Sequence, residues 1–204
     1  YYELGARFTK WRAVININKS HPSDIAINAN THALARYASI VQETKMVPII
    51  EPEVLMNGDH DIDKCYEITA KVLQRCYEEL KLYNVDLKGT ILKPNMVLPG
   101  DKSLNKSSSE EIAKKTLKCL RENVPTEVPG IAFLSGGQSE IEATQNLNAI
   151  NKINDTDFII SFSYGRALQQ GALKNWGKDQ KDVSNTQKIF SQRSKMNGLA
   201  STGQ

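Results

Sequence analysis

A lysine followed by a proline closes a short apolar run near the middle of the chain, Thr90-Ile91-Leu92-Lys93-Pro94. Pro94 cannot continue a helix and has no backbone N–H, so the run is predicted to be a short buried strand with Lys93 at its carboxyl end. Removal from water disfavours a charged ammonium, and the free amine that results is the nucleophile needed for imine chemistry. From this stretch alone, the alternative is a lysine that extends from the strand tip into solvent.

Two carboxylates follow another apolar run, where Val47–Ile50 leads into Glu51-Pro52-Glu53. Residues two apart in a strand face the same side, so Glu51 and Glu53 could point into one site. Repulsion between them would favour the protonated form of one and suit it to proton transfer. The alternative is a pair of solvated carboxylates.

Lys10 and Arg12 share one face of the extended segment that leads into the first predicted strand. Cations there could hold an anionic substrate and favour the neutral amine of Lys93. The alternative is a solvated basic edge.

Glycine-containing loops follow the last two predicted strands. Ser135-Gly136-Gly137 precedes a helix, and Ser163-Tyr164-Gly165-Arg166 repeats this arrangement one strand later. Glycine lets the backbone approach an anion, helix amides donate to it, and a guanidinium suits phosphate. Either loop alone could be an ordinary turn, but two on consecutive strands match the usual phosphate site of β/α barrels.

Apolar and polar periodicity predicts five strand-then-helix units. The strands are expected at 13–17, 47–50, 90–92, 131–134 and 158–162, and helices at 24–45, 59–83, 107–123, 139–152, about 166–176 and 179–196. Such alternation predicts an α/β fold with a parallel sheet covered by helices, in one domain over residues 1–204. It is either an open doubly wound sheet or the later part of a (β/α)8 barrel. The core is predicted to include Leu117, Leu120, Ile141, Leu147 and Ile150, and the tail 198–204 is expected to be unstructured.

The composition narrows the function classes. The 204 residues are 40% hydrophobic and 24% charged, with a net charge of +3 whose basic residues are scattered, so neither nucleic acid nor a membrane surface is the expected partner. Three cysteines without metal-ligand spacing indicate reduced thiols in a cytoplasmic protein. The first residues, Tyr1-Tyr2-Glu3-Leu4, include no initiator methionine and no signal-peptide pattern.

Six stretches, in order along nearly the whole chain, resemble class I fructose-1,6-bisphosphate aldolase. They are Gly-Ala-Arg-Phe-Thr-Lys-Trp-Arg at 5–12, Val-Pro-Ile-Ile-Glu-Pro-Glu-Val-Leu at 47–55, Leu-Lys-Pro-Asn-Met-Val at 92–97, Phe-Leu-Ser-Gly-Gly-Gln-Ser-Glu at 133–140, Leu-Asn-Ala-Ile-Asn at 147–151 and Phe-Ser-Tyr-Gly-Arg-Ala-Leu-Gln at 162–169. An unrelated doubly wound phosphate-binding domain would require these serial matches to be coincidence.

The resemblance implies a Schiff-base aldolase without metal or other cofactor, acting on a phosphorylated sugar. By similarity, Lys93 forms the imine, Glu51 is the acid and base, Glu53 supports it electrostatically, Lys10 holds the intermediate and Arg12 contributes to substrate binding. The stretches that resemble the phosphate-binding set contribute Ser135, Gly136, Ser163, Gly165 and Arg166. A homotetramer is implied for the full-length protein.

The resemblance also implies that the chain holds strands four to eight of the barrel. The family's first three strands, with an aspartate and a lysine of the site, and its C-terminal extension with a tyrosine would lie outside residues 1–204. We therefore expect a fragment of a longer coding sequence. The competing hypothesis is a truncated, inactive relative that acts as a binding or scaffold protein.

Overall fold

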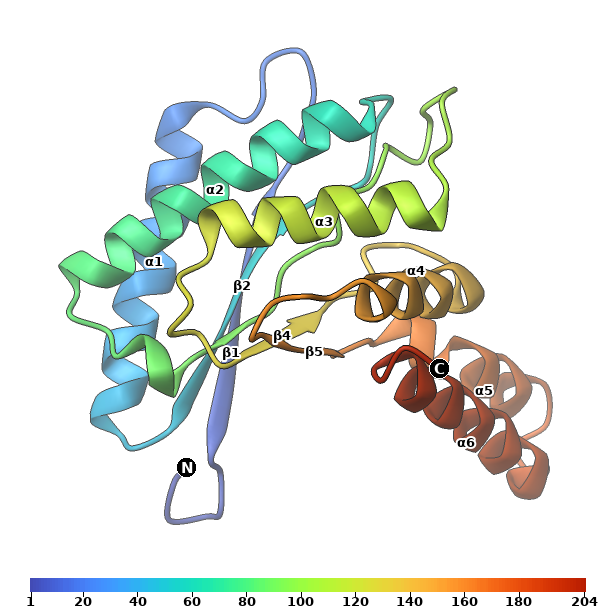
Figure 1. Cartoon of the computed structure of the whole chain (residues 1–204). Helices are drawn as coiled ribbons and strands as arrows, with labels where there is room; N and C mark the ends of the chain where they lie inside the picture. Colours follow the sequence, from blue (N-terminus) through green and yellow to red (C-terminus); the bar gives the residue numbers. More distant parts are fainter.

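The computed structural model describes residues 1–204 and contains one sheet of five parallel strands, whose spatial order follows the chain. The strands are β1 (Phe8–Ile15), β2 (Val47–Val54), β3 (Ile91–Leu92), β4 (Gly130–Phe133) and β5 (Ile159–Phe162). A doubly wound sheet reverses its strand order and carries helices on both faces. Here the order never reverses, and α1 to α4 lie on the same side of the sheet (Figure 1). The fold is therefore a partial (β/α)8 barrel, as the second alternative predicted.

Each strand is followed by a helix, and a short 3₁₀ turn, Leu87–Gly89, precedes β3. The helices are α1 (Asp24–Glu43), α2 (Ile62–Leu82), α3 (Ser109–Asn123), α4 (Glu140–Lys152), α5 (Arg166–Lys178) and α6 (Val183–Ala200). Side-chain caps fix most helix starts, because a serine or aspartate oxygen accepts one of the first free amides. The residues that do this are Ser23, Asp61, Ser108, Ser139 and Asp182. No helix has both the length and the apolar character that a membrane crossing requires.

The hydrophobic core lies between the sheet and its helices. Alternate strand residues such as Ile50, Leu92, Ile131 and Phe133 point toward the helices and are fully buried. Of the five helix residues predicted for the core, four are buried, namely Leu117, Leu120, Leu147 and Ile150. The prediction for Ile141 is wrong, because it lies on the outer face of the first turn of α4 and is 63% exposed.

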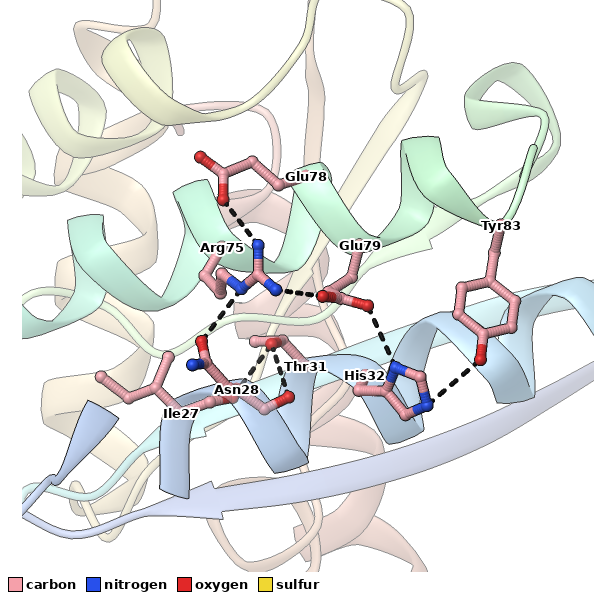
Figure 2. A network of polar contacts seen from close by, with 8 residues as sticks. All are labelled: Ile27, Asn28, Thr31, His32, Arg75, Glu78, Glu79 and Tyr83. Atoms are coloured by element: carbon pink, nitrogen blue, oxygen red, sulfur yellow. Dashed lines mark hydrogen bonds and ion pairs between the residues drawn. The ribbon is translucent and has the colours of Figure 1, made fainter. Parts of the chain in front are cut away.

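A polar network fixes α1 against α2 (Figure 2). Arg75 forms an ion pair with the buried carboxylate of Glu79 and donates from Nε to Asn28 Oδ1 at 3.0 Å. Glu79 Oε2 also lies 3.1 Å from His32 Nδ1, and His32 Nε2 lies 3.2 Å from the Tyr83 hydroxyl. The buried carboxylate thus has partners on both helices, which holds the helix pair that covers β1 and β2 in one arrangement.

The predicted bounds of the first two strands are wrong. They were expected at 13–17 and 47–50, but β1 pairs with β2 over eight positions, from Phe8↔Val47 to Ile15↔Val54, so Glu51 and Glu53 also lie within a strand. Lys10 and Arg12 are therefore strand residues, and their charges are tolerated in the ladder because acidic partners lie on β2.

The unstructured tail predicted for 198–204 is also wrong over its first half. α6 continues through Ala200, which is 1% exposed, and Asn151 Nδ2 donates to the Ala200 carbonyl at 3.1 Å. The small side chain of Ala200 is buried where the end of α6 packs on α4.

Candidate active site

The register of the sheet makes Glu51 and Lys93 neighbours. β2 and β3 pair through Ile49↔Ile91 and Ile50↔Leu92, so Glu51 and Lys93 come next on their two strands. The Lys93 N–H donates to the Ile50 carbonyl at 2.7 Å and extends the ladder by one residue. Residues at matching positions of parallel strands face the same side of the sheet. Both side chains therefore project from the face opposite the one that α1 to α4 cover.

The Glu51 carboxylate lies between two ammonium groups. Its Oε1 is 3.1 Å from Lys93 Nζ, and its Oε2 is 3.0 Å from Lys10 Nζ. Glu51 is 3% exposed and Lys93 is 8% exposed, whereas the Lys10 side chain is 42% exposed. The structure therefore excludes both the solvent-extended lysine and the solvated carboxylate. A buried amine beside a carboxylate can pass it a proton, which is what an amine needs before it attacks a carbonyl.

The second carboxylate has its own cation. Glu53 is buried, and its Oε2 accepts a hydrogen bond from Arg12 Nε, which raises the pKa of Arg12. Lys10 and Arg12 are partly solvated, with side chains 42% and 47% exposed, but each forms an ion pair with a buried carboxylate of β2 and so is not a free basic edge. The structure thus brings together on one face all the residues predicted for proton transfer and imine formation.

The two predicted phosphate loops lie at adjacent strand ends. The Ser163 N–H donates to the Phe133 carbonyl at 2.8 Å and ties the end of β5 to that of β4. Gly136 has a φ of +59°, a left-handed conformation that suits glycine. Arg166 begins α5, and Gly165 caps it without a side chain, so the first amides of α5 remain free to donate.

Buried amides that the sequence analysis gave no role support the first of these loops. Gln138 Nε2 donates to the Ser135 carbonyl at 3.0 Å, and Asn146 Nδ2 donates to Gln138 Oε1 at 2.7 Å. The second loop is held by the buried Tyr164, whose hydroxyl donates to the Ala143 carbonyl at 2.9 Å. The sequence contained one signal for this support: Asn146 is an amide residue on the core-facing side of an amphipathic helix, where a buried polar group needs a hydrogen-bond partner.

The family model described as fructose-bisphosphate aldolase class-I matches residues 1–204, which is the whole chain. The chain belongs to the class I fructose-bisphosphate aldolase family. It is similar to cytosolic fructose-bisphosphate aldolase 4 of Arabidopsis thaliana, with 53% identity over 100% of this chain and 52% of the relative. It is also similar to the cytoplasmic isozyme of Spinacia oleracea, with 51% identity over 100% of this chain and 57% of the relative.

A solved aldolase structure has the same fold. The Plasmodium falciparum fructose-bisphosphate aldolase, solved in complex with TRAP and a small-molecule inhibitor, aligns with a TM-score of 0.97 and 43% identity over 100% of this chain and 59% of that one. The chain therefore spans between half and about three fifths of the length of these aldolases.

A cavity of about 880 Å³ opens between α2 and the α3–β4 loop, and its lining contains none of the predicted site residues. No group of three or more histidine, cysteine, aspartate or glutamate side chains is arranged to hold a metal ion.

Proposed function

We propose that the protein with this chain is a class I fructose-bisphosphate aldolase, a carbon–carbon lyase of glycolysis and gluconeogenesis. It would cleave fructose 1,6-bisphosphate reversibly to dihydroxyacetone phosphate and glyceraldehyde 3-phosphate through a lysine Schiff base. The observation that carries the proposal is the buried contact of Lys93 Nζ with Glu51 Oε1, 3.1 Å apart at the carboxyl end of a parallel sheet. Membership of the class I aldolase family supports this reaction.

The proposed chemistry begins at Lys93. Its free amine attacks the C2 ketone of the sugar, and Glu51 donates the proton with which the carbinolamine loses water. When the C4 hydroxyl then gives its proton to Glu51, the electrons of the C3–C4 bond move into the iminium and glyceraldehyde 3-phosphate leaves. Protonation of the enamine at C3 and hydrolysis of the imine release dihydroxyacetone phosphate and return the amine.

The other site residues bind and orient the substrate in this proposal. Glu53, held by Arg12, keeps negative charge beside Glu51, and Lys10 holds the oxygen atoms of the intermediate. The substrate phosphates would bind at the two loops after β4 and β5, through Ser135, Gly136, Ser163, Gly165 and Arg166. The proposal includes no metal or cofactor, a cytoplasmic location, a single barrel domain to which residues 1–204 belong, and a homotetramer for the full-length enzyme.

The test is borohydride trapping of the imine with fructose 1,6-bisphosphate, read as the mass of the intact chain. We expect one adduct on the 204-residue chain, lost in Lys93→Ala and kept in Lys88→Ala, because Lys88 is an exposed lysine outside the site. An adduct that survives Lys93→Ala would refute Lys93 as the nucleophile.

A hybrid protein makes a negative result decisive. In it, residues 1–204 replace the matching segment of the Arabidopsis thaliana relative, which supplies the rest of an aldolase chain. Aldol cleavage by the hybrid, abolished by Lys93→Ala, would support the proposal. A folded hybrid without cleavage and without adduct would refute it and favour an inactive relative with a binding or scaffold role.

A further inference from the structure

The backbone hydrogen-bond ladder between β2 and β3 ends at Lys93, just where the candidate site begins. β3 has two residues, the Lys93 N–H makes the last bond to β2, and Pro94 has no N–H to donate. Glu51 and Glu53, however, lie on the part of β2 that continues beyond this point, to Val54. Something other than the ladder must therefore hold the two strand ends together.

The carboxamide of Asn95 bridges this gap. Its Oδ1 accepts the Val54 N–H at 3.0 Å, and its Nδ2 donates to Thr69 Oγ1 on α2 and to the Met96 carbonyl, each at 3.0 Å. The next amide along the chain, that of Leu55 just after β2, points the other way and donates to the Ile15 carbonyl at 2.9 Å. The Val54 N–H is thus directed toward the Lys93 strand, and Asn95 supplies the acceptor that the interrupted ladder lacks.

Asn95 is suited to this place because all of its hydrogen-bonding groups are used. The residue is buried, both of its N–H groups have an acceptor, and its oxygen has a donor. A leucine there would leave the Val54 N–H without a partner, and a buried unpaired amide is costly.

We infer that Asn95 is a positioning residue, which sets the distance between Lys93 and the carboxylates of β2 and so the rate of imine formation. The inference rests on the function proposed above. Asn95 touches neither the lysine amine nor a carboxylate; it acts through Val54, next to Glu53, and through its own backbone, two residues after Lys93. Its effect is expected on turnover, because the phosphate loops that dominate substrate binding follow β4 and β5.

The experiment compares Asn95→Leu with Thr116→Val in the hybrid protein described above. Thr116 Oγ1 accepts the Val97 N–H at 3.0 Å, so Thr116→Val, like Asn95→Leu at Val54, leaves a buried backbone amide without its side-chain acceptor, but in the segment after β3 and without contact to β2. We expect kcat to fall roughly 100-fold in Asn95→Leu with KM changed less than about threefold, and both constants to stay within about threefold in Thr116→Val. The concentration of active sites is measured as the amplitude of imine trapping, and kcat is calculated per active site. Loss of folded protein is then not mistaken for a slower reaction.

A second variant and a second measurement guard against misfolding. Asn95→Asp keeps an oxygen acceptor for the Val54 N–H, and we expect its turnover to lie between those of the parent and Asn95→Leu. Hydrogen exchange in the 204-residue chain should be at least about tenfold faster at the Val54 amide in Asn95→Leu than in the parent.

Either of two results would overturn the inference: equal losses of kcat in Asn95→Leu and Thr116→Val, or unchanged exchange at Val54. If the parent hybrid forms no imine, the proposed function fails, and exchange at Val54 alone then decides whether Asn95 joins the strands.

Discussion

Lys10 and Glu51 are diagonal neighbours on adjacent strands, with Nζ and Oε2 3.0 Å apart. The residue directly opposite Glu51 is Arg12, which instead reaches the next carboxylate, Glu53. Each cation of β1 thus contacts the acid that lies two residues further along β2 than its own pairing partner. This shift leaves Glu51 Oε1 free to face Lys93, so one carboxylate contacts two lysines that come from opposite sides of β2.

Glu51→Gln tests that shared carboxylate. The amide keeps the shape but removes the charge between Lys93 and Lys10, so we expect a loss of about 2 kcal/mol in the free energy of unfolding. Imine trapping should slow by at least about 100-fold, because the proposed proton acceptor for Lys93 is gone. The control is Glu43→Gln, an exposed glutamate at the end of α1 without an ion pair. Urea unfolding and trapping rates that match between the two variants would contradict the assignment.

His60 is expected to make the fold less stable in acid. It is buried, neither ring nitrogen has a hydrogen-bond partner, and burial lowers the pKa of His60 below its ordinary value of 6.5. As the pH falls through 6.5 toward that lowered pKa, the unfolded chain binds a proton that the folded chain does not, so stability is lost over that range. Above pH 7, His60→Leu should be neutral or stabilising by about 1 kcal/mol, because the leucine has no polar atom to leave unpaired.

The check on His60 is urea unfolding at pH 5 and pH 8. His60→Leu should show a smaller difference between the two pH values than the parent. The control is His21→Leu, at an exposed histidine, which should keep the parent's difference. An unchanged pH dependence in His60→Leu would show that His60 is not the titrating group.

Gly100→Ala should destabilise the loops beside the site. A Cβ at residue 100 would lie 2.2 Å from the Gly58 carbonyl oxygen, and backbone atoms cannot move aside cheaply. The β2–α2 loop, which contains Gly58, and the β3–α3 loop, which contains Gly100, are also joined by hydrogen bonds. The Gly100 and Lys102 amides donate to the His60 and Gly58 carbonyls, respectively, each at 2.8 Å. We expect a loss of roughly 1–3 kcal/mol by thermal unfolding.

Gly177→Ala is the matched control for that substitution. Nothing lies within 4 Å of its added Cβ, and it is in α5, where alanine is the better helix former by up to about 1 kcal/mol. A Gly100→Ala variant as stable as Gly177→Ala would show that the loops can separate without cost.

The three cysteines should react only when the chain opens. Cys65, Cys76 and Cys119 are buried, and burial raises the pKa of all three, to about 12 for Cys76 and Cys119. Because the thiolate is the reactive form, we expect an aromatic disulfide reagent at pH 8 to modify each at least about 100-fold more slowly than in urea. Fast modification of any one of them in the native chain would show that its helix opens locally.

Much of the candidate site could be predicted from the sequence because the signals are local. An apolar run that ends in Lys93-Pro94, acids after the preceding strand and glycine loops before two helices each depend on a few adjacent residues. The alternation of strands and helices, together with those end residues, predicted a candidate site at the carboxyl ends of a parallel sheet.

Only the tertiary structure decided what depends on residues far apart in the chain. β1 begins at Phe8 because β2 offers a partner for every residue as far as Val47, and α6 continues to Ala200 because α4 covers its end. The sequence left Lys93 either buried or solvated, and it gave no role to Asn95. The physical reason is that periodicity and turn chemistry depend on residues close together in the sequence. Strand register, burial and the partner of a buried polar group are fixed only when distant strands and helices pack together.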